Sequence, residues 1–178
     1  MVPDRSTRNR RVTLRALAIT TLQGCALAIV LLGSGDAFAR TLATGTLNEP
    51  STLSGRWKFS VGDDLAWADP TYDDSHWDEL LVPGGWGRQG YPEHSGIAWL
   101  RLEIDLSQAL ADGLDDFQLG VQMGEITSSY ELFAGGTKVG GVGALPPDAR
   151  MEYDRHRIYK LPKSSIDDGH RVVLALRV

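Results

Sequence analysis

The chain has little cysteine, few basic side chains and no long stretch with a helical period. Its one cysteine, Cys25, lies near the start, so the rest of the sequence has neither a disulfide nor thiol chemistry available to it. Lys and Arg total 18 against 23 Asp and Glu, without a basic stripe to neutralise phosphates, which argues against nucleic-acid binding. The 4 histidines are widely spaced and form no metal-binding pattern. A folded domain here must be stabilised by its hydrophobic core.

Residues 1–39 differ in character from the remainder. A basic segment with five arginines is followed by an apolar run, residues 16–33, and by the small-residue pattern Ala37-Phe38-Ala39. This order is typical of a secretory signal peptide, so we predict export to the periplasm with cleavage after Ala39. The alternative is an uncleaved membrane anchor, because an apolar run of this length can just span a bilayer. Cleavage would lower the basic count from 18 to 13 and the acidic count from 23 to 21, a net charge of −8.

The remaining chain is predicted to be a linker followed by one domain. Residues 40–52 are small and polar, which is typical of a linker, and the domain covers 53–178. Within it, short segments with period-two alternation are separated by turn residues. We predict strands at 56–61, 77–83, 98–106, 116–124, 130–135, 156–162 and 171–178. Residues 107–114 are too short and glycine-rich to be more than a turn. The pattern predicts an all-β fold, a two-sheet antiparallel β-sandwich of the jelly-roll type.

Two local patterns predict which side of one strand faces the core and where a hairpin turn lies. Residues 98–106 alternate strictly, and the apolar set of this strand is expected to face the core: Leu100, Leu102, Ile104 and Leu106. The intervening positions are Trp99, Arg101, Glu103 and Asp105. The pair Gly135-Gly136 suits a tight hairpin turn, because such turns need a positive φ.

The most acidic stretch, "DDLAWADPTYDDSHWDEL" at 63–80, has seven carboxylates. Adjacent side chains in an extended segment point to opposite faces, which is wrong for the paired carboxylates of a glycosidase. We expect instead that Asp73 or Asp74 caps the turn before Trp77, and that Trp67 and Trp77 pack over the sheet edge. The alternative is a calcium site with Asp73 and Asp74 among its ligands, since Ca²⁺ takes six to eight oxygen ligands.

A glycine-rich loop at 83–96, "PGGWGRQGYPEHSG", is the best candidate for ligand binding. An aromatic plane with amide and charged donors is what a sugar ring requires. The candidate ligand-binding residues are Trp86, Arg88, Gln89, Tyr91 and His94. The alternative is structural, with Trp86 and Tyr91 packing down to hold the loop on the sandwich.

Four segments together resemble a known module: "LSGRWKFSVGDD" (53–64), "DDSHWDELLVPGGWGRQGY" (73–91), "GIAWLRLEIDL" (96–106) and "YELFAGGTKVGGVG" (130–143). Their order is similar to the galactose-binding-like jelly roll found as the N-terminal sugar-binding domain of family 2 glycoside hydrolases. Similar modules stand at the N-terminal side of some bacterial membrane signalling proteins, such as sensor kinases, phosphatases and diguanylate cyclases. In the glycosidases, the loop that matches 83–96 approaches the substrate site from the neighbouring domain, which itself holds the catalytic acid and nucleophile.

This resemblance implies a non-catalytic, exported module that binds a carbohydrate-like ligand or a partner domain. We expect it to be the extracytoplasmic sensory part of a bacterial signalling protein, with a downstream output domain as its partner. The alternative is the sugar-binding domain of a family 2 glycoside hydrolase, and a third hypothesis is a structural or interaction domain without a small ligand. The sequence indicates no cofactor apart from the calcium alternative.

Overall fold

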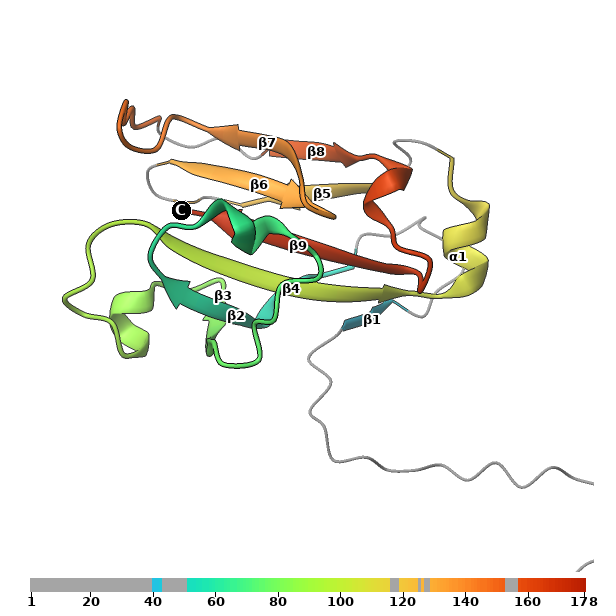
Figure 1. Ribbon diagram of the computed structural model, residues 1–178, viewed down its shortest axis with the longest axis horizontal. Helices are drawn as coiled ribbons and strands as arrows, with labels where there is room; N and C mark the ends of the chain where they lie inside the picture. The colour runs from blue at the N-terminus through green and yellow to red at the C-terminus, as the bar shows by residue number, and fades with distance from the viewer. Residues whose placement is uncertain (1–39, 43–50, 116–118, 125, 127–128, 153–156) are drawn as a thin grey trace, which may run out of the picture. The chain divides into compact units, whose positions relative to one another are not determined.

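The structure, a computed structural model, describes residues 40–42, 51–115, 119–124, 126, 129–152 and 157–178. Within these residues the chain forms nine β-strands (Figure 1). They are β1 (Arg40–Leu42), β2 (Gly55–Val61), β3 (Asp78–Val82), β4 (Ala98–Leu106), β5 (Leu119–Met123), β6 (Tyr130–Ala134), β7 (Thr137–Val142), β8 (Arg157–Leu161) and β9 (Arg171–Arg177). The predicted signal segment, 1–39, and the first residues of the strands predicted at 116–124 and 156–162 lie outside the described residues.

The described ranges also contain short helices: α1 (Gln108–Gly113) and the 3-10 helices η1 (Leu65–Ala68), η2 (Trp86–Gln89) and η3 (Lys163–Ser165). The prediction that 107–114 forms no more than a turn was wrong. The segment forms the six-residue helix α1, because Ala111 and Leu114 are buried against the core and this burial stabilises a short helix that would not persist alone. No helix in the part of the chain described here is long and apolar enough to cross a membrane.

The strands form two sheets. Seven strands make up the large sheet, in the order β3-β2-β4-β9-β6-β7 with β1 alongside β4, and β5 pairs with β8 in the small sheet. All pairings are antiparallel except that of β1 with β4, which joins the start of the predicted linker to the domain. The predicted hairpin joins β6 to β7, and Gly135 and Gly136 both have positive φ, 53° and 80°. The predicted all-β sandwich is confirmed.

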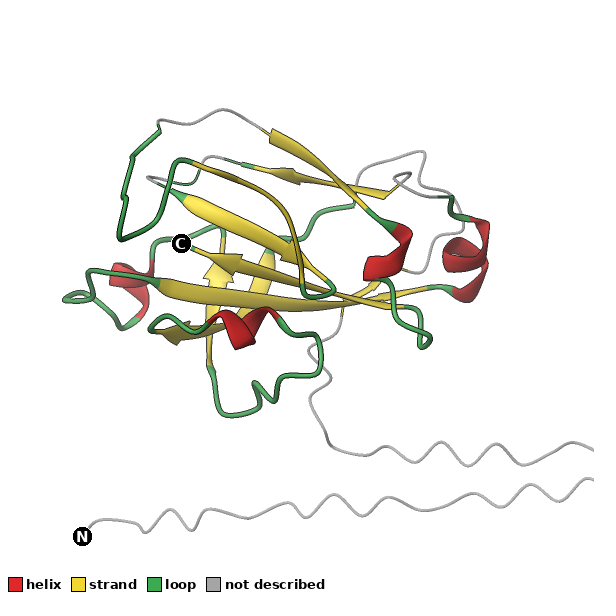
Figure 2. Cartoon of the chain, turned by 45° about the horizontal axis from the view of Figure 1, so that its top comes forward, coloured by secondary structure: helices red, strands yellow, loops and turns green. Residues whose placement is uncertain are grey.

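The main core lies between the two sheets, which Figure 2 shows as separate layers. The predicted inward set of β4 is buried there, with Leu102 only 3 % exposed. The small sheet lies beside β6 and β7, on the side of the large sheet away from β2 and β3 (Figure 1). The apolar side chains of β2, Trp57 and Phe59, are nevertheless buried, so another segment must complete the core at that end.

The opposite face of the large sheet has its own apolar cluster, made by the segment 62–77, which we call the strap. The strap crosses in front of β4 and β9 in Figure 1. Its buried members Ala68 and Trp77 pack with Trp99 of β4 and Ala175 of β9. Trp67 joins them, with its ring centroid 5.0 Å from that of Trp77. The two tryptophans therefore cover the middle of the sheet rather than its edge, which corrects the sequence prediction.

Candidate functional site

The loop 83–96 connects β3 to β4 and contains the candidate ligand-binding residues. Its centre is the 3-10 helix η2, which ends at Gly90 with a φ of 109°. Only glycine adopts this conformation readily, so Gly90 sets the point at which the chain turns back toward the sheet. The amide of Tyr91 donates to the carbonyl oxygen of Trp86 over 3.2 Å, which closes the turn.

The aromatic residues of the loop complete the main core at β2. The ring centroid of Tyr91 lies 4.7 Å from that of Phe59 in an edge-to-face arrangement, and the centroid of Trp86 lies 6.1 Å from Phe59. Both loop residues are half-buried and pack against the core cluster. Their faces toward Phe59 are therefore used inside the protein, as the structural alternative expects, and aromatic pairs of this geometry add to the stabilisation from burial.

Gln89 binds the backbone of β3. Its side-chain oxygen accepts from the amide of Leu81 over 2.8 Å, and its side-chain nitrogen donates to the carbonyl oxygen of Leu81 over 3.0 Å. The carboxamide thus uses one of its two N–H donors and one of the two lone pairs of its oxygen within the chain.

Tyr91 also has a partner at its polar end. Its hydroxyl donates to the carboxylate of Asp78, the first residue of β3. This hydrogen bond, together with burial, raises the pKa of the Tyr91 phenol. Tyr91 is therefore held at both ends, by Phe59 and by Asp78.

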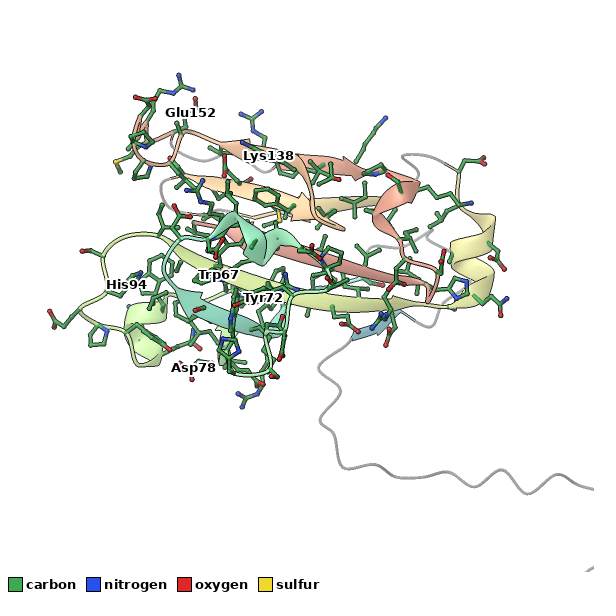
Figure 3. All side chains as sticks on the ribbon, viewed as in Figure 1. Trp67, Tyr72, Asp78, His94, Lys138 and Glu152 are labelled. Atoms are coloured by element: carbon green, nitrogen blue, oxygen red, sulfur yellow. The ribbon has the colours of Figure 1, made fainter. Side chains whose placement is uncertain are left out.

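The other two candidate residues, Arg88 and His94, differ in exposure. Arg88 is exposed, at the end of η2. The His94 ring lies 5.8 Å from that of Trp86, and its Nε2 is buried without a hydrogen-bond partner among the described residues. Figure 3 shows His94 beside the loop, well apart from Lys138 and Glu152. The loop thus exposes one cationic side chain, Arg88, and holds a half-buried imidazole whose Nε2 faces the interior.

The acidic stretch 63–80 has internal partners for every carboxylate. Four bind backbone or side chains nearby: Asp64 accepts from Ala66, Asp69 from Thr71, Asp73 from Ser75 and Asp78 from Tyr91. The other three form ion pairs across the fold: Asp63 with Arg177, Asp74 with Arg101 and Glu79 with Lys58. The expected turn cap before Trp77 is present at Asp73, whose carboxylate accepts from the Ser75 amide over 3.0 Å.

The calcium candidates are part of this arrangement. Asp74 Oδ2 lies 2.7 Å from Nε of Arg101, and a bound cation would compete with that guanidinium. Within the described ranges, no group of three or more His, Cys, Asp or Glu side chains is placed to hold a metal ion.

Sequence reasoning missed the role of Arg101, which is only 3 % exposed. Besides Asp74, its guanidinium donates to the carbonyl oxygens of Trp67 and Asp69, the latter over 3.0 Å, and lies 5.8 Å from the centroid of Tyr72. It therefore holds the strap on β4; Figure 3 shows Trp67 and Tyr72 in front of the sheet. The signal available in the sequence was an arginine between two leucines expected to face the core, in a chain whose segment 63–80 is rich in aromatic and acidic residues.

No known protein family and no curated protein matches the sequence. Solved structures do match. A Bacteroides uniformis beta-glucuronidase is 23 % identical, with a TM-score of 0.55 over 72 % of this chain and 14 % of its own. A Bifidobacterium dentium beta-glucuronidase is 16 % identical, with a TM-score of 0.55 over 71 % of this chain and 19 % of its own. A glycosyl hydrolase family 2 member from Bacteroides cellulosilyticus is 16 % identical, with a TM-score of 0.55 over 72 % of this chain and 17 % of its own.

These likenesses show that the chain shares the fold of one β-sandwich portion of much larger proteins. The chain spans less than a quarter of the length of the structures named above. The part of the sequence-based resemblance that refers to a domain of family 2 glycoside hydrolases is supported at the level of fold.

Proposed function

We propose that the chain is a non-catalytic carbohydrate-binding β-sandwich domain that works alongside a glycosidase domain. The observation that supports this most directly is the fold shared with beta-glucuronidases, in which the likeness covers 72 % of this chain but only 14 % of the neighbour. This reverses the order of our two leading hypotheses, because the structural neighbours named above are glycosidases and nothing observed favours the signalling sensor.

A non-catalytic role is consistent with the way the carboxylates of residues 63–80 are paired. Glycosidases place two carboxyl groups about 5–10 Å apart across the sugar, with one pKa raised. In residues 63–80 every acidic side chain has a structural partner, and the pKa values of Asp63, Asp69 and Asp73 are lowered by their hydrogen bonds to Arg177, Thr71 and Ser75. These groups are suited to stay ionised and to hold the strap, not to donate a proton to a leaving group.

Within the 83–96 loop the five candidate residues divide into two roles. Trp86, Gln89 and Tyr91 fix the loop on the sandwich. We assign ligand contact to the exposed guanidinium of Arg88 and to the part of the half-buried His94 ring other than its buried Nε2. A guanidinium recognises a carboxylate through two parallel hydrogen bonds. A sugar acid such as glucuronic acid is therefore the first ligand to test, with neutral sugars as the comparison.

We also propose, from the sequence of residues 1–39, that the chain is exported to the periplasm. Mass spectrometry of protein recovered from a periplasmic fraction tests this, and the expected N-terminus is Arg40. A chain that retains Met1 in the membrane fraction would favour the uncleaved anchor.

The test of ligand binding is thermal unfolding of the purified full chain with glucuronic acid, galacturonic acid, glucose and galactose. A ligand at a hundred times its dissociation constant adds about 2.7 kcal/mol to the free energy of unfolding, which raises the melting temperature measurably. We expect the sugar acid to raise it and the neutral sugars to do so less.

Variants assign the effect to the loop. Arg88→Ala and His94→Ala should lose the sugar-dependent shift and keep the melting temperature of the free protein. Arg56→Ala is the matched control, because the Arg56 side chain is 64 % exposed and lies on β2. A shift that survives both loop substitutions would place binding elsewhere, and a flat response to all sugars would favour a structural or interaction domain.

A further inference from the structure

The outer edge of β3 is closed by a side chain. β3 is the terminal strand of the large sheet, paired on one side with β2. The N–H and C=O of Leu81 both point away from β2, and both are bound by the carboxamide of Gln89, over 2.8 Å and 3.0 Å. We call this carboxamide the edge cap.

The edge cap reproduces what a neighbouring strand would supply. In an antiparallel ladder, two residues that lie opposite each other exchange both of their N–H···O bonds. A primary amide offers the same donor and acceptor on one planar group. Gln89 therefore occupies the position that a peptide group of an added strand would take at Leu81.

The surrounding residues are fitted to this contact. A Cβ placed on Gly84 would lie 2.9 Å from Nε2 of Gln89 and 2.7 Å from the carbonyl oxygen of Leu81. Only glycine allows the loop to pass this close, since contacts below about 3.0 Å force atoms to shift. Gly84 and the edge cap are therefore two separate features of the chain that both close the outer edge of β3 at Leu81.

Without the cap, the edge would suit a second copy of itself. The Leu81 side chain is 54 % exposed, so the uncapped edge would offer an apolar residue and an unpaired N–H and C=O at one position. Exposed edges of this kind are templates for pairing with another chain. Because both groups belong to one residue, two Leu81 residues from different copies can lie opposite each other and exchange both bonds, with their side chains as a cross-strand pair.

We infer that Gln89 keeps the chain monomeric, and that withdrawal of its carboxamide, together with movement of Gly84 away from the Leu81 carbonyl oxygen, lets β3 pair antiparallel with β3 of a second copy, centred on Leu81. The pairing is short. It runs from Glu79 to Pro83, which would lie opposite each other, and Pro83 has no N–H to extend it. Pairing about one residue gives a two-fold symmetric contact, the commonest form of homodimer.

The test uses the full chain and the variants Gln89→Ala and Gln89→Glu. Light scattering after size exclusion over a concentration series measures the oligomeric state, and hydrogen exchange by NMR measures protection of the Leu81 amide. We expect the unmodified chain to be monomeric with a protected Leu81 amide. In dilute Gln89→Ala, before pairing, this amide should exchange at least about tenfold faster, and the mass should approach that of a dimer as concentration rises.

Two further variants keep the inference falsifiable. Gln122→Ala removes an exposed glutamine from β5 and should leave the mass and the Leu81 amide unchanged. Leu81→Lys added to Gln89→Ala should restore the monomer, because like charges would face each other across the pair.

Should Gln89→Ala fail to fold, Gln89→Glu gives the answer, since it keeps an acceptor for the Leu81 N–H but sets an oxygen against the Leu81 carbonyl. A Gln89→Ala or Gln89→Glu chain that stays monomeric, or a dimer that persists with Leu81→Lys, would overturn the inference.

Discussion

Arg101 shows how one side chain determines the arrangement of a long connection. Its guanidinium leaves water almost completely, which costs free energy unless each donor finds an acceptor and the charge finds a partner. Asp74 supplies the charge, and the carbonyl oxygens of Trp67 and Asp69 supply acceptors at the centre of the strap. A polar group in this position stabilises one path of the strap over β4, because other paths would leave the guanidinium unpaired.

We therefore expect Arg101→Ala to lower the free energy of unfolding by about 3 kcal/mol, since it leaves two carbonyl oxygens and a partly buried carboxylate without their donor. Urea unfolding measures this change. Arg56→Ala removes a largely exposed arginine from the neighbouring strand and should stay within about 0.5 kcal/mol of the unmodified chain. If the two substitutions had equal effects, Arg101 would not hold the strap.

The strap also shows which elements the sequence could predict. The period-two pattern of β4 correctly placed Leu100 and Leu102 in the core, because alternation is a local property of one strand. The same pattern set Trp99 and Arg101 on the outward positions, without indicating that both would be buried. What buries them is a segment more than twenty residues earlier, and no local period records a contact between a loop and a sheet face.

For the loop 83–96, too, the sequence predicts residue types but not their contacts. Its residue types suit sugar binding, and the sequence could not decide between that use and packing. The structure gives Trp86 and Tyr91 contacts with Phe59, and gives Gln89 a backbone partner that no motif predicts. Arg88 and His94 remain predictions as ligand-binding residues.

The strap's own packing can be tested at Trp77, its last residue, which is 6 % exposed. Trp77→Ala should cost about 3–5 kcal/mol of unfolding free energy, as truncations of buried aromatic residues do. Amides inside the strap, such as that of Trp67 bonded to Asp64, should exchange faster in the variant. Leu65→Ala is the control, because Leu65 lies in the strap but is 62 % exposed and should change stability little. Equal losses for the two variants would mean that the strap has no organised core.

For the whole molecule, charge pairing joins segments that are distant in sequence. Arg177 of β9 binds Asp63 at the start of the strap and Glu131 of β6, with Nη1 2.8 Å from the Glu131 carboxylate. The hydrogen bond from Arg177 lowers the pKa of Asp63. Burial opposes ionisation of Glu131, but the hydrogen bonds and charges of Lys138 and Arg177 outweigh it and lower the Glu131 pKa. Burial likewise opposes ionisation of Asp167, and the hydrogen bonds and charge of Arg171 outweigh it and lower the Asp167 pKa.

These lowered pKa values determine how the free energy of unfolding changes on the acid side of neutrality, which we call the acid limb. A carboxylate whose pKa is lower in the folded than in the unfolded chain contributes stability that is present above the unfolded pKa, about 4, and is lost as pH falls through the folded pKa. The unfolded chain binds more protons in this window, so the free energy of unfolding must fall with acid there.

We expect the free energy of unfolding to be nearly constant from pH 7 to about pH 5 and to fall steeply below about pH 4. Urea titrations at each pH measure this, and Asp63→Asn should give a shallower acid limb, because one of the shifted carboxylates is gone. A free energy of unfolding that stays constant down to about pH 2, or an acid limb unchanged by Asp63→Asn, would mean that the Arg177 network does not stabilise the fold.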